Sequence, residues 1–179
     1  MMDRMYAGWR LGAPPGAGAD GLPYEAIEPE PGKTLFETIE QSPLGDDRTY
    51  LIARRRSCFA VLNVYPYSSG HVMVLPKRAV PNILELTDEE HDDLWQLVRI
   101  AYLAVGEAFK PDGMNVGINE GRAGGASIPD HLHVHVVPRW YADTSFTTTV
   151  AEARVLPMTL RDSWLRVRAC WPEPLPSQQ

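Results

Sequence analysis

Three histidines stand at alternate positions in one short segment of the chain, at His131, His133 and His135. Successive side chains of a β-strand point to opposite faces, so a strand over residues 131–137 would place all three imidazoles on one face. The residues between them, which would enter a core, are apolar: Leu132, Val134 and Val136. Titratable groups crowded in this way indicate a site that binds a ligand or reacts. A strand of this kind also implies a β-sheet to which it belongs.

Other segments predict the rest of that sheet and its helices. Strand-forming residues bounded by turn residues predict strands at 48–53, 58–64, 71–75 and 114–119. A helix is predicted at 87–109, where Thr87 and Glu90 have the spacing of a capping box. A second helix is predicted at 160–170, with three residues facing inward: Trp164, Leu165 and Val167. This order favours an α+β fold, an antiparallel sheet of about five strands with one long helix and a C-terminal helix.

The length of 179 residues fits one domain with extensions. Glycine, proline and alanine are frequent before residue 34, so we expect residues 1–33 to form a flexible or extended arm. The compact domain is predicted to cover 34–171 and to open with a helical turn. The prolines that follow predict a disordered tail at 172–179.

Composition excludes several classes of protein. The net charge of −6 and the pI near 5.3 argue against a nucleic-acid binder, although an acidic chain can still bind a small nucleotide. The two cysteines, Cys58 and Cys170, give neither a disulfide framework nor a metal signature, so a cytoplasmic location is expected. No apolar stretch approaches the ~20 residues of a membrane span, and the start lacks the apolar run of a signal peptide.

The residues alone leave three roles open for the histidines. They can ligate a metal, although on an ideal strand the first and third imidazoles lie about 13 Å apart, too far for one ion. One of them can act as a nucleophile that the others orient, or all three can be ordinary buried histidines. The loop at 121–127 favours the nucleophile, because its glycines and the Ser127 hydroxyl can hold a phosphate against His133.

The segment 131–137 resembles the HφHφHφφ signature (φ apolar) of the histidine triad superfamily of nucleotidyl hydrolases and transferases. Asn63, Pro66 and the run Gly70–Val74 resemble a second segment of that family, and 114–119 resembles its strand before the phosphate loop. The ending Val137-Pro138-Arg139-Trp140 is similar to that of bacterial diadenosine tetraphosphate phosphorylases.

This resemblance implies a role for each matching residue. His133 would be the nucleophile that becomes nucleotidylated, and His135 would contact the phosphate. His131 would hold the strand and loop in place, with His71 as a supporting histidine. Asn63 would bind ribose hydroxyls. The phosphate or the leaving group would be bound at four further positions: Asn119, Gly125, Ala126 and Ser127.

The resemblance also implies the reaction and the partners. The favoured activity is phosphorolysis of diadenosine tetraphosphate to ATP and ADP, with orthophosphate as co-substrate. The alternatives are a hydrolase of phosphoramidates or dinucleoside polyphosphates, and a catalytically silent nucleotide-binding protein. A homodimer is expected, with a tetramer as the alternative. The sequence requires no cofactor beyond a divalent cation that the nucleotide can carry, and 34–37 lacks the cysteines with which some relatives bind structural zinc, so no metal site is expected.

Overall fold

The computed structural model describes residues 27–144, 156 and 158–172. Residues 1–26 of the predicted arm and 173–179 of the predicted tail lie outside the described residues, so both domain boundaries stay predictions. Within the described part of the chain, no helix is both long enough and apolar enough to cross a membrane.

The centre of the fold is a five-stranded sheet in the order β1-β2-β3-β5-β4, with every neighbouring pair antiparallel. The strands are β1 (Leu51–Arg54), β2 (Cys58–Leu62), β3 (Val72–Pro76), β4 (Gly113–Ile118) and β5 (Val134–Arg139). β1, β2 and β3 follow one another as a meander, and β5 inserts between β3 and β4. The α+β fold with five antiparallel strands is therefore confirmed.

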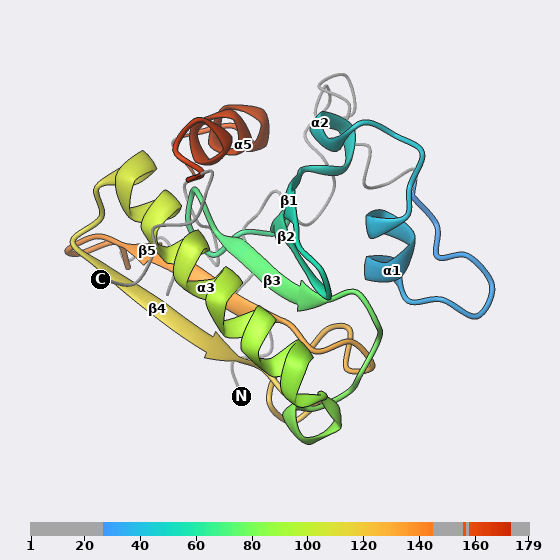
Figure 1. Ribbon diagram of the computed structural model, residues 1–179. Helices are drawn as coiled ribbons and strands as arrows, with labels where there is room; N and C mark the ends of the chain where they lie inside the picture. The colour runs from blue at the N-terminus through green and yellow to red at the C-terminus, as the bar shows by residue number, and fades with distance from the viewer. Residues whose placement is uncertain (1–26, 145–155, 157, 173–179) are drawn as a thin grey trace.

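The long helix α3 (Asp88–Phe109) lies across one face of the sheet, and the C-terminal helix α5 (Leu160–Ala169) lies near the end of α3 (Figure 1). Thr87 caps α3 and forms the predicted capping box with Glu90. The remaining helices in the described part of the chain are short: α1 (Leu35–Glu40), α2 (Asp46–Thr49) and the 3-10 turn η3 (Ile83–Glu85). Both predicted long helices are thus confirmed to within a residue or two.

Each face of the sheet has its own apolar core. Leu132, Val134 and Val136 pack with the buried face of α3, as the alternating pattern predicted. The opposite face carries a smaller cluster that α1 covers, made of Phe36, Ile39, Leu51, Phe59, Val61, Met73 and Leu75. The histidines therefore belong to the face that α1 covers, away from the main core.

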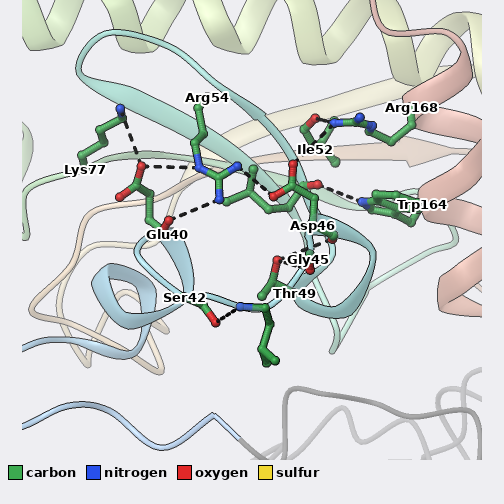
Figure 2. A network of polar contacts seen from close by, with 12 residues as sticks. Glu40, Ser42, Gly45, Asp46, Thr49, Ile52, Arg54, Lys77, Trp164 and Arg168 are labelled. Carbon is green, nitrogen blue, oxygen red and sulfur yellow. Dashed lines mark hydrogen bonds and ion pairs between the residues drawn. The ribbon is translucent and has the colours of Figure 1, made fainter.

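Strand β1 is an edge of the sheet, and polar side chains from α5 occupy its outer carbonyl groups (Figure 2). The indole Nε1–H of Trp164 donates to Leu51 O at 2.9 Å, and Arg168 Nη1 donates to Ile52 O at 2.6 Å. Arg54 also pairs with Asp46 Oδ1 at 2.8 Å, which fixes α2 to the same strand. These bonds occupy two backbone acceptors of an edge strand that would otherwise be available to a partner.

Three details differ from the predictions. β5 begins at Val134 rather than at 131, because its ladder with β3 starts at the pair Val74↔Val134 and the preceding residues follow a loop. The predicted strand at 48–53 begins only at Leu51, since residues 48 and 49 end α2. Leu165 points to solvent with 47% of its surface exposed, because its neighbours Trp164 and Val167 already face the core.

Candidate active site

Four of the five histidines lie in a row along β3 and the start of β5, from His71, just before β3, to His131, which binds Pro76 at the end of β3. His71 and His131 are fully buried, and His133 and His135 retain only 4% and 7% of their exposure. The ring centroids of His133 and His135 lie 4.8 Å apart, and those of His71 and His135 lie 5.0 Å apart. The fifth, His91, stands half exposed on α3. The structure therefore brings the four histidines predicted from sequence into one cluster.

The backbone fixes the proton positions in the first pair of imidazoles. The amide N–H of Tyr67 lies 3.1 Å from His71 Nδ1 and can only donate, so that nitrogen carries the lone pair. In the neutral ring the proton then sits on His71 Nε2, which donates to His135 Nδ1 at 2.9 Å. His135 consequently carries its own proton on Nε2, and the Asn119 amide, whose nitrogen lies 3.4 Å from Nε2, must turn its oxygen to the ring to accept from it. That N–H is a donor directed at the site.

A second chain of hydrogen bonds fixes the proton positions of His131 and His133. His131 Nε2 lies 2.8 Å from the carbonyl oxygen of Pro76, which can only accept, so Nε2 carries the proton. His133 Nδ1 lies 2.9 Å from the carbonyl oxygen of His131, and it must donate to that oxygen for the same reason. The neutral His133 ring therefore has its lone pair on Nε2. An imidazole with this tautomer is prepared for nucleophilic attack.

Burial keeps the rings of His131, His133 and His135 neutral. Desolvation lowers the pKa of His133, against an opposing contribution from its hydrogen bond to the His131 carbonyl. It lowers the pKa of His131 as well, and it lowers the pKa of His135 to about 4, with a further contribution from the proximity of His133. At neutral pH the rings of His131, His133 and His135 are thus uncharged.

A cavity of about 410 Å³ opens in front of the cluster. This volume lies within the range of small-molecule sites, roughly 300–1,000 Å³. The predicted residues that line it are Asn63, Asn119, Gly125, Ser127, His133 and His135. His71, His131 and Ala126 are not part of the lining. His71 and His131 lie behind the lining residues. His71 is hydrogen-bonded to His135, and the backbone carbonyl of His131 is hydrogen-bonded to His133.

The glycine-rich loop uses two of its own amides internally. Gly125 N–H donates to Arg122 O and Ala126 N–H donates to Gly121 O, each at 3.1 Å. These two amides therefore do not form the open anion nest that the loop composition suggested. The Ser127 hydroxyl lines the cavity, and its role as a phosphate donor stays a prediction.

Asn63 closes the turn between β2 and β3. Its Oδ1 accepts the backbone N–H of Tyr65 at 2.9 Å, and its Nδ2 lies 3.3 Å from His71 Nδ1. The side chains of Tyr65 and Tyr67, in the same turn, also line the cavity, together with Leu35, Met73 and Ile128, and the motifs of the sequence did not indicate them. Alternation along β3 could have indicated Met73, because it shares a face with Leu75 and lies opposite Val72 and Val74.

The described residues contain no group of three or more histidine, cysteine or acidic side chains placed to hold a metal ion. A second hollow, of about 520 Å³, lies over Arg55, Asp93 and Gln96. Arg55 donates to Asp93 at 2.6 Å and to Gln96 at 2.9 Å, so these polar groups already satisfy one another. The histidine cavity is thus the stronger candidate for the active site.

The fold and this site define an α+β domain that presents a neutral histidine to a cavity of nucleotide-binding size. Comparison with known families agrees, since the family described as "HIT domain" matches residues 46–141. The chain belongs to this family, as the segment 131–137 predicted.

Known relatives share this domain. The chain is 42% identical over 128 residues to the AP-4-A phosphorylase of Mycobacterium tuberculosis, covering 72% of this chain and 65% of that protein. It is 38% identical over 103 residues to the asymmetrical bis(5'-nucleosyl)-tetraphosphatase of Schizosaccharomyces pombe, covering 58% and 54% respectively. The chain therefore spans less than two thirds of the length of these curated relatives.

Solved structures share the fold. A hypothetical histidine triad nucleotide-binding protein from Sulfolobus tokodaii superposes with a TM-score of 0.62 at 28% identity. The superposition covers 76% of this chain and 91% of that protein.

Proposed function

We propose that this protein is a nucleotidyl transferase that cleaves dinucleoside polyphosphates through a nucleotidyl-histidine intermediate. The favoured reaction is phosphorolysis of diadenosine tetraphosphate to ATP and ADP. The observation that carries the proposal is the tautomer of His133, whose Nδ1–H is bound to the His131 carbonyl while the ring lines the cavity. The similarity to the AP-4-A phosphorylase supports the choice of substrate.

In the first half-reaction His133 Nε2 attacks the α-phosphorus of the substrate in line with the leaving group. A nitrogen–phosphorus bond forms, and the bond from the α-phosphorus to the bridging oxygen of the β-phosphate breaks. ATP leaves with that electron pair, and AMP stays on the ring. The Nε2–H of His135 is directed at the same region and donates to a phosphate oxygen as charge develops there.

In the second half-reaction an oxygen of orthophosphate attacks the same phosphorus. The nitrogen–phosphorus bond breaks, ADP forms, and His133 recovers its lone pair. Two displacements thus replace one, and the histidine is regenerated without net consumption of protons on the ring. Water in place of orthophosphate would give AMP, which is the hydrolase alternative, and the similarity to the tetraphosphatase keeps that alternative in the test.

The lining of the cavity favours a polyphosphate substrate that is bound together with a cation. Among the described residues, those that line the cavity include neither lysine nor arginine. A polyphosphate chain carries several negative charges, and neutral imidazoles do not balance them. We therefore propose that a divalent cation accompanies the nucleotide.

The assay that tests the proposal uses labelled diadenosine tetraphosphate with and without orthophosphate. Phosphate-dependent formation of ATP and ADP supports the phosphorylase. Release of AMP in the absence of phosphate would instead identify a hydrolase. Tight binding of the substrate without turnover would identify a catalytically silent nucleotide-binding protein. Chelation of divalent cations is expected to slow turnover at every substrate concentration.

Replacement of the nucleophile gives the matched variant. His133→Ala is expected to abolish turnover while the protein stays folded, because the side chain lost is the reacting group. His91→Ala removes an exposed histidine from α3 and serves as the control. Turnover by His133→Ala close to that of the control would reject the assignment of the nucleophile.

The quaternary structure and the location belong to the same proposal. We propose a homodimer in the cytoplasm, with a tetramer as the alternative, and sedimentation velocity distinguishes the two assemblies.

A further inference from the structure

The capping residue of α1 contacts the triad directly. Thr34 is the N-cap of α1, and its Oγ1 lies 2.7 Å from His131 Nδ1, although the two residues are 97 positions apart in the chain. Thr34 also makes the bonds of an ordinary capping box, in which its Oγ1 accepts the N–H of Glu37 at 3.3 Å. One hydroxyl therefore serves a helix cap and a histidine at the same time.

Two acceptors lie within reach of the proton on this hydroxyl, His131 Nδ1 at 2.7 Å and Glu37 Oε2 at 3.1 Å, and the tautomer of His131 decides between them. His131 Nε2 donates to the Pro76 carbonyl, so in the neutral ring Nδ1 carries the lone pair and must accept from Thr34. The Thr34 hydroxyl accepts from Glu37 N–H and donates to His131, which satisfies both ends of the group. Glu37 Oε2 in turn accepts the backbone N–H of Thr34 at 2.8 Å, so the carboxylate needs no hydroxyl proton.

Glu37 connects the same cap to the loop after β3. Its Oε1 accepts the backbone N–H of Ala79 at 3.2 Å, three residues beyond the Pro76 carbonyl that binds His131. The acidic member of the capping box thus binds the loop after β3, and the imidazole binds the end of β3 itself. The two attachments fix the His131 ring relative to α1 and to β3.

α1 adds an aromatic contact to these polar ones. The ring of Phe36 meets His131 edge to face at a centroid distance of 5.5 Å, and it lies 5.6 Å from His133. The cap and the aromatic ring thus both contact the His131 ring, whose Nε2 is bound to Pro76. Any rotation of His131 would break the hydrogen bond to Thr34 and disturb this packing.

We propose that Thr34 and Glu37 are positioning residues of the active site, which hold His131 as its Nε2–H tautomer and thereby orient the nucleophile His133. The connection to His133 is the carbonyl of His131, which accepts Nδ1–H of His133 at 2.9 Å. A mobile His131 would loosen that bond, and the lone pair on His133 Nε2 would lose its fixed direction. The capping box of a six-residue helix is then part of the catalytic arrangement.

The structure offers a matched control for this proposal. Thr87 caps α3 through a capping box with Glu90, and Glu90 N–H donates to Thr87 Oγ1 at 3.2 Å, nearly the distance found in α1. Its hydroxyl contacts Glu90 and no histidine. Thr34→Val and Thr87→Val therefore remove the same kind of cap, and only the first removes a bond to the triad.

The kinetic test compares these variants on diadenosine tetraphosphate and rests on the proposed function. Thr34→Val is expected to lower kcat roughly tenfold with little change in KM, as loss of one orienting hydrogen bond implies. Thr34→Ser keeps the hydroxyl and is expected to restore kcat, and Thr87→Val is expected to keep the kcat of the unmodified protein. Equal kcat values for Thr34→Val and Thr87→Val would overturn the proposal.

A second readout is independent of turnover. Two-bond proton–nitrogen NMR spectra report which ring nitrogen of each histidine carries the proton. The unmodified protein is expected to show His131 protonated on Nε2 and His133 on Nδ1, and Thr34→Val is expected to speed the exchange of both ring protons with solvent. Slow exchange that Thr34→Val leaves unchanged would reject the positioning role. Absence of turnover in the unmodified protein would reject the proposed function and leave this spectroscopic test intact.

Discussion

The buried histidines predict that this protein loses stability in mild acid. Folding lowers the pKa of His135 from 6.5 to about 4, mainly through desolvation. At ~1.4 kcal/mol per pKa unit this difference corresponds to about 3 kcal/mol of stability. Because the folded pKa lies below the unfolded one, the contribution is complete above pH 6.5 and is lost as the pH falls from 6.5 towards 4. The pKa values of His131 and His133 are also lowered, so they act in the same direction.

The loss can be worked out for an accessible interval. Proton linkage for His135 alone gives a decrease of about 2 kcal/mol in the free energy of unfolding between pH 7 and pH 5. Urea denaturation at a series of pH values measures this decrease. His135→Gln is expected to flatten the dependence, whereas His91→Gln, which changes an exposed histidine, is expected to keep it. An unfolding free energy that is constant from pH 7 to pH 5, or equal slopes for the two variants, would refute the reasoning.

Two further predictions concern the structure around the site. Gly70 has a φ of +84°, and a Cβ there would lie 2.7 Å from Cδ2 of Phe109, so Gly70→Ala is expected to destabilise the protein by about 2 kcal/mol in thermal or urea denaturation. Gly113→Ala, where a Cβ meets nothing within 4 Å, is the control, and equal effects of the two changes would contradict the argument. Asp93 accepts hydrogen bonds from Ser57 N–H, Ser57 Oγ and Arg55 Nε, so Asp93→Asn is expected to cost about 2 kcal/mol, while the exposed Asp92→Asn is expected to cost little. An Asp93→Asn protein as stable as the Asp92→Asn protein would show that these bonds contribute nothing.

The periodic pattern of apolar residues predicted most of the helices and strands, because contacts between residues close in sequence determine these elements. The capping box at Thr87, the apolar stripe of α3 and the alternation of the strands each reflect contacts within a short stretch of chain. The extent of β5 was not predictable in this way. Leu132 N–H donates to Val80 O at 2.6 Å instead of joining the sheet ladder, and only the tertiary structure places Val80 there.

The histidines of the site could be predicted from the sequence, whereas the contacts that support them could be predicted only in part. The pattern at 131–137 identified the histidines, and the resemblance identified His71, which lies beside His135. The bond from Thr34 to His131 joins residues 97 positions apart, and no local pattern links them. The internal bonding of Gly125 and Ala126 was also hidden, because the composition of a glycine-rich loop does not specify which amides face outward.

The most direct test of the central claim is to observe the covalent intermediate. The protein is mixed with diadenosine tetraphosphate in the absence of orthophosphate, quenched rapidly into alkaline denaturant, and analysed by mass spectrometry. The account predicts one AMP group per chain, located on His133, and its discharge as ADP when orthophosphate is added before the quench. Steady turnover without any adduct on His133, or an adduct on a different residue, would contradict it.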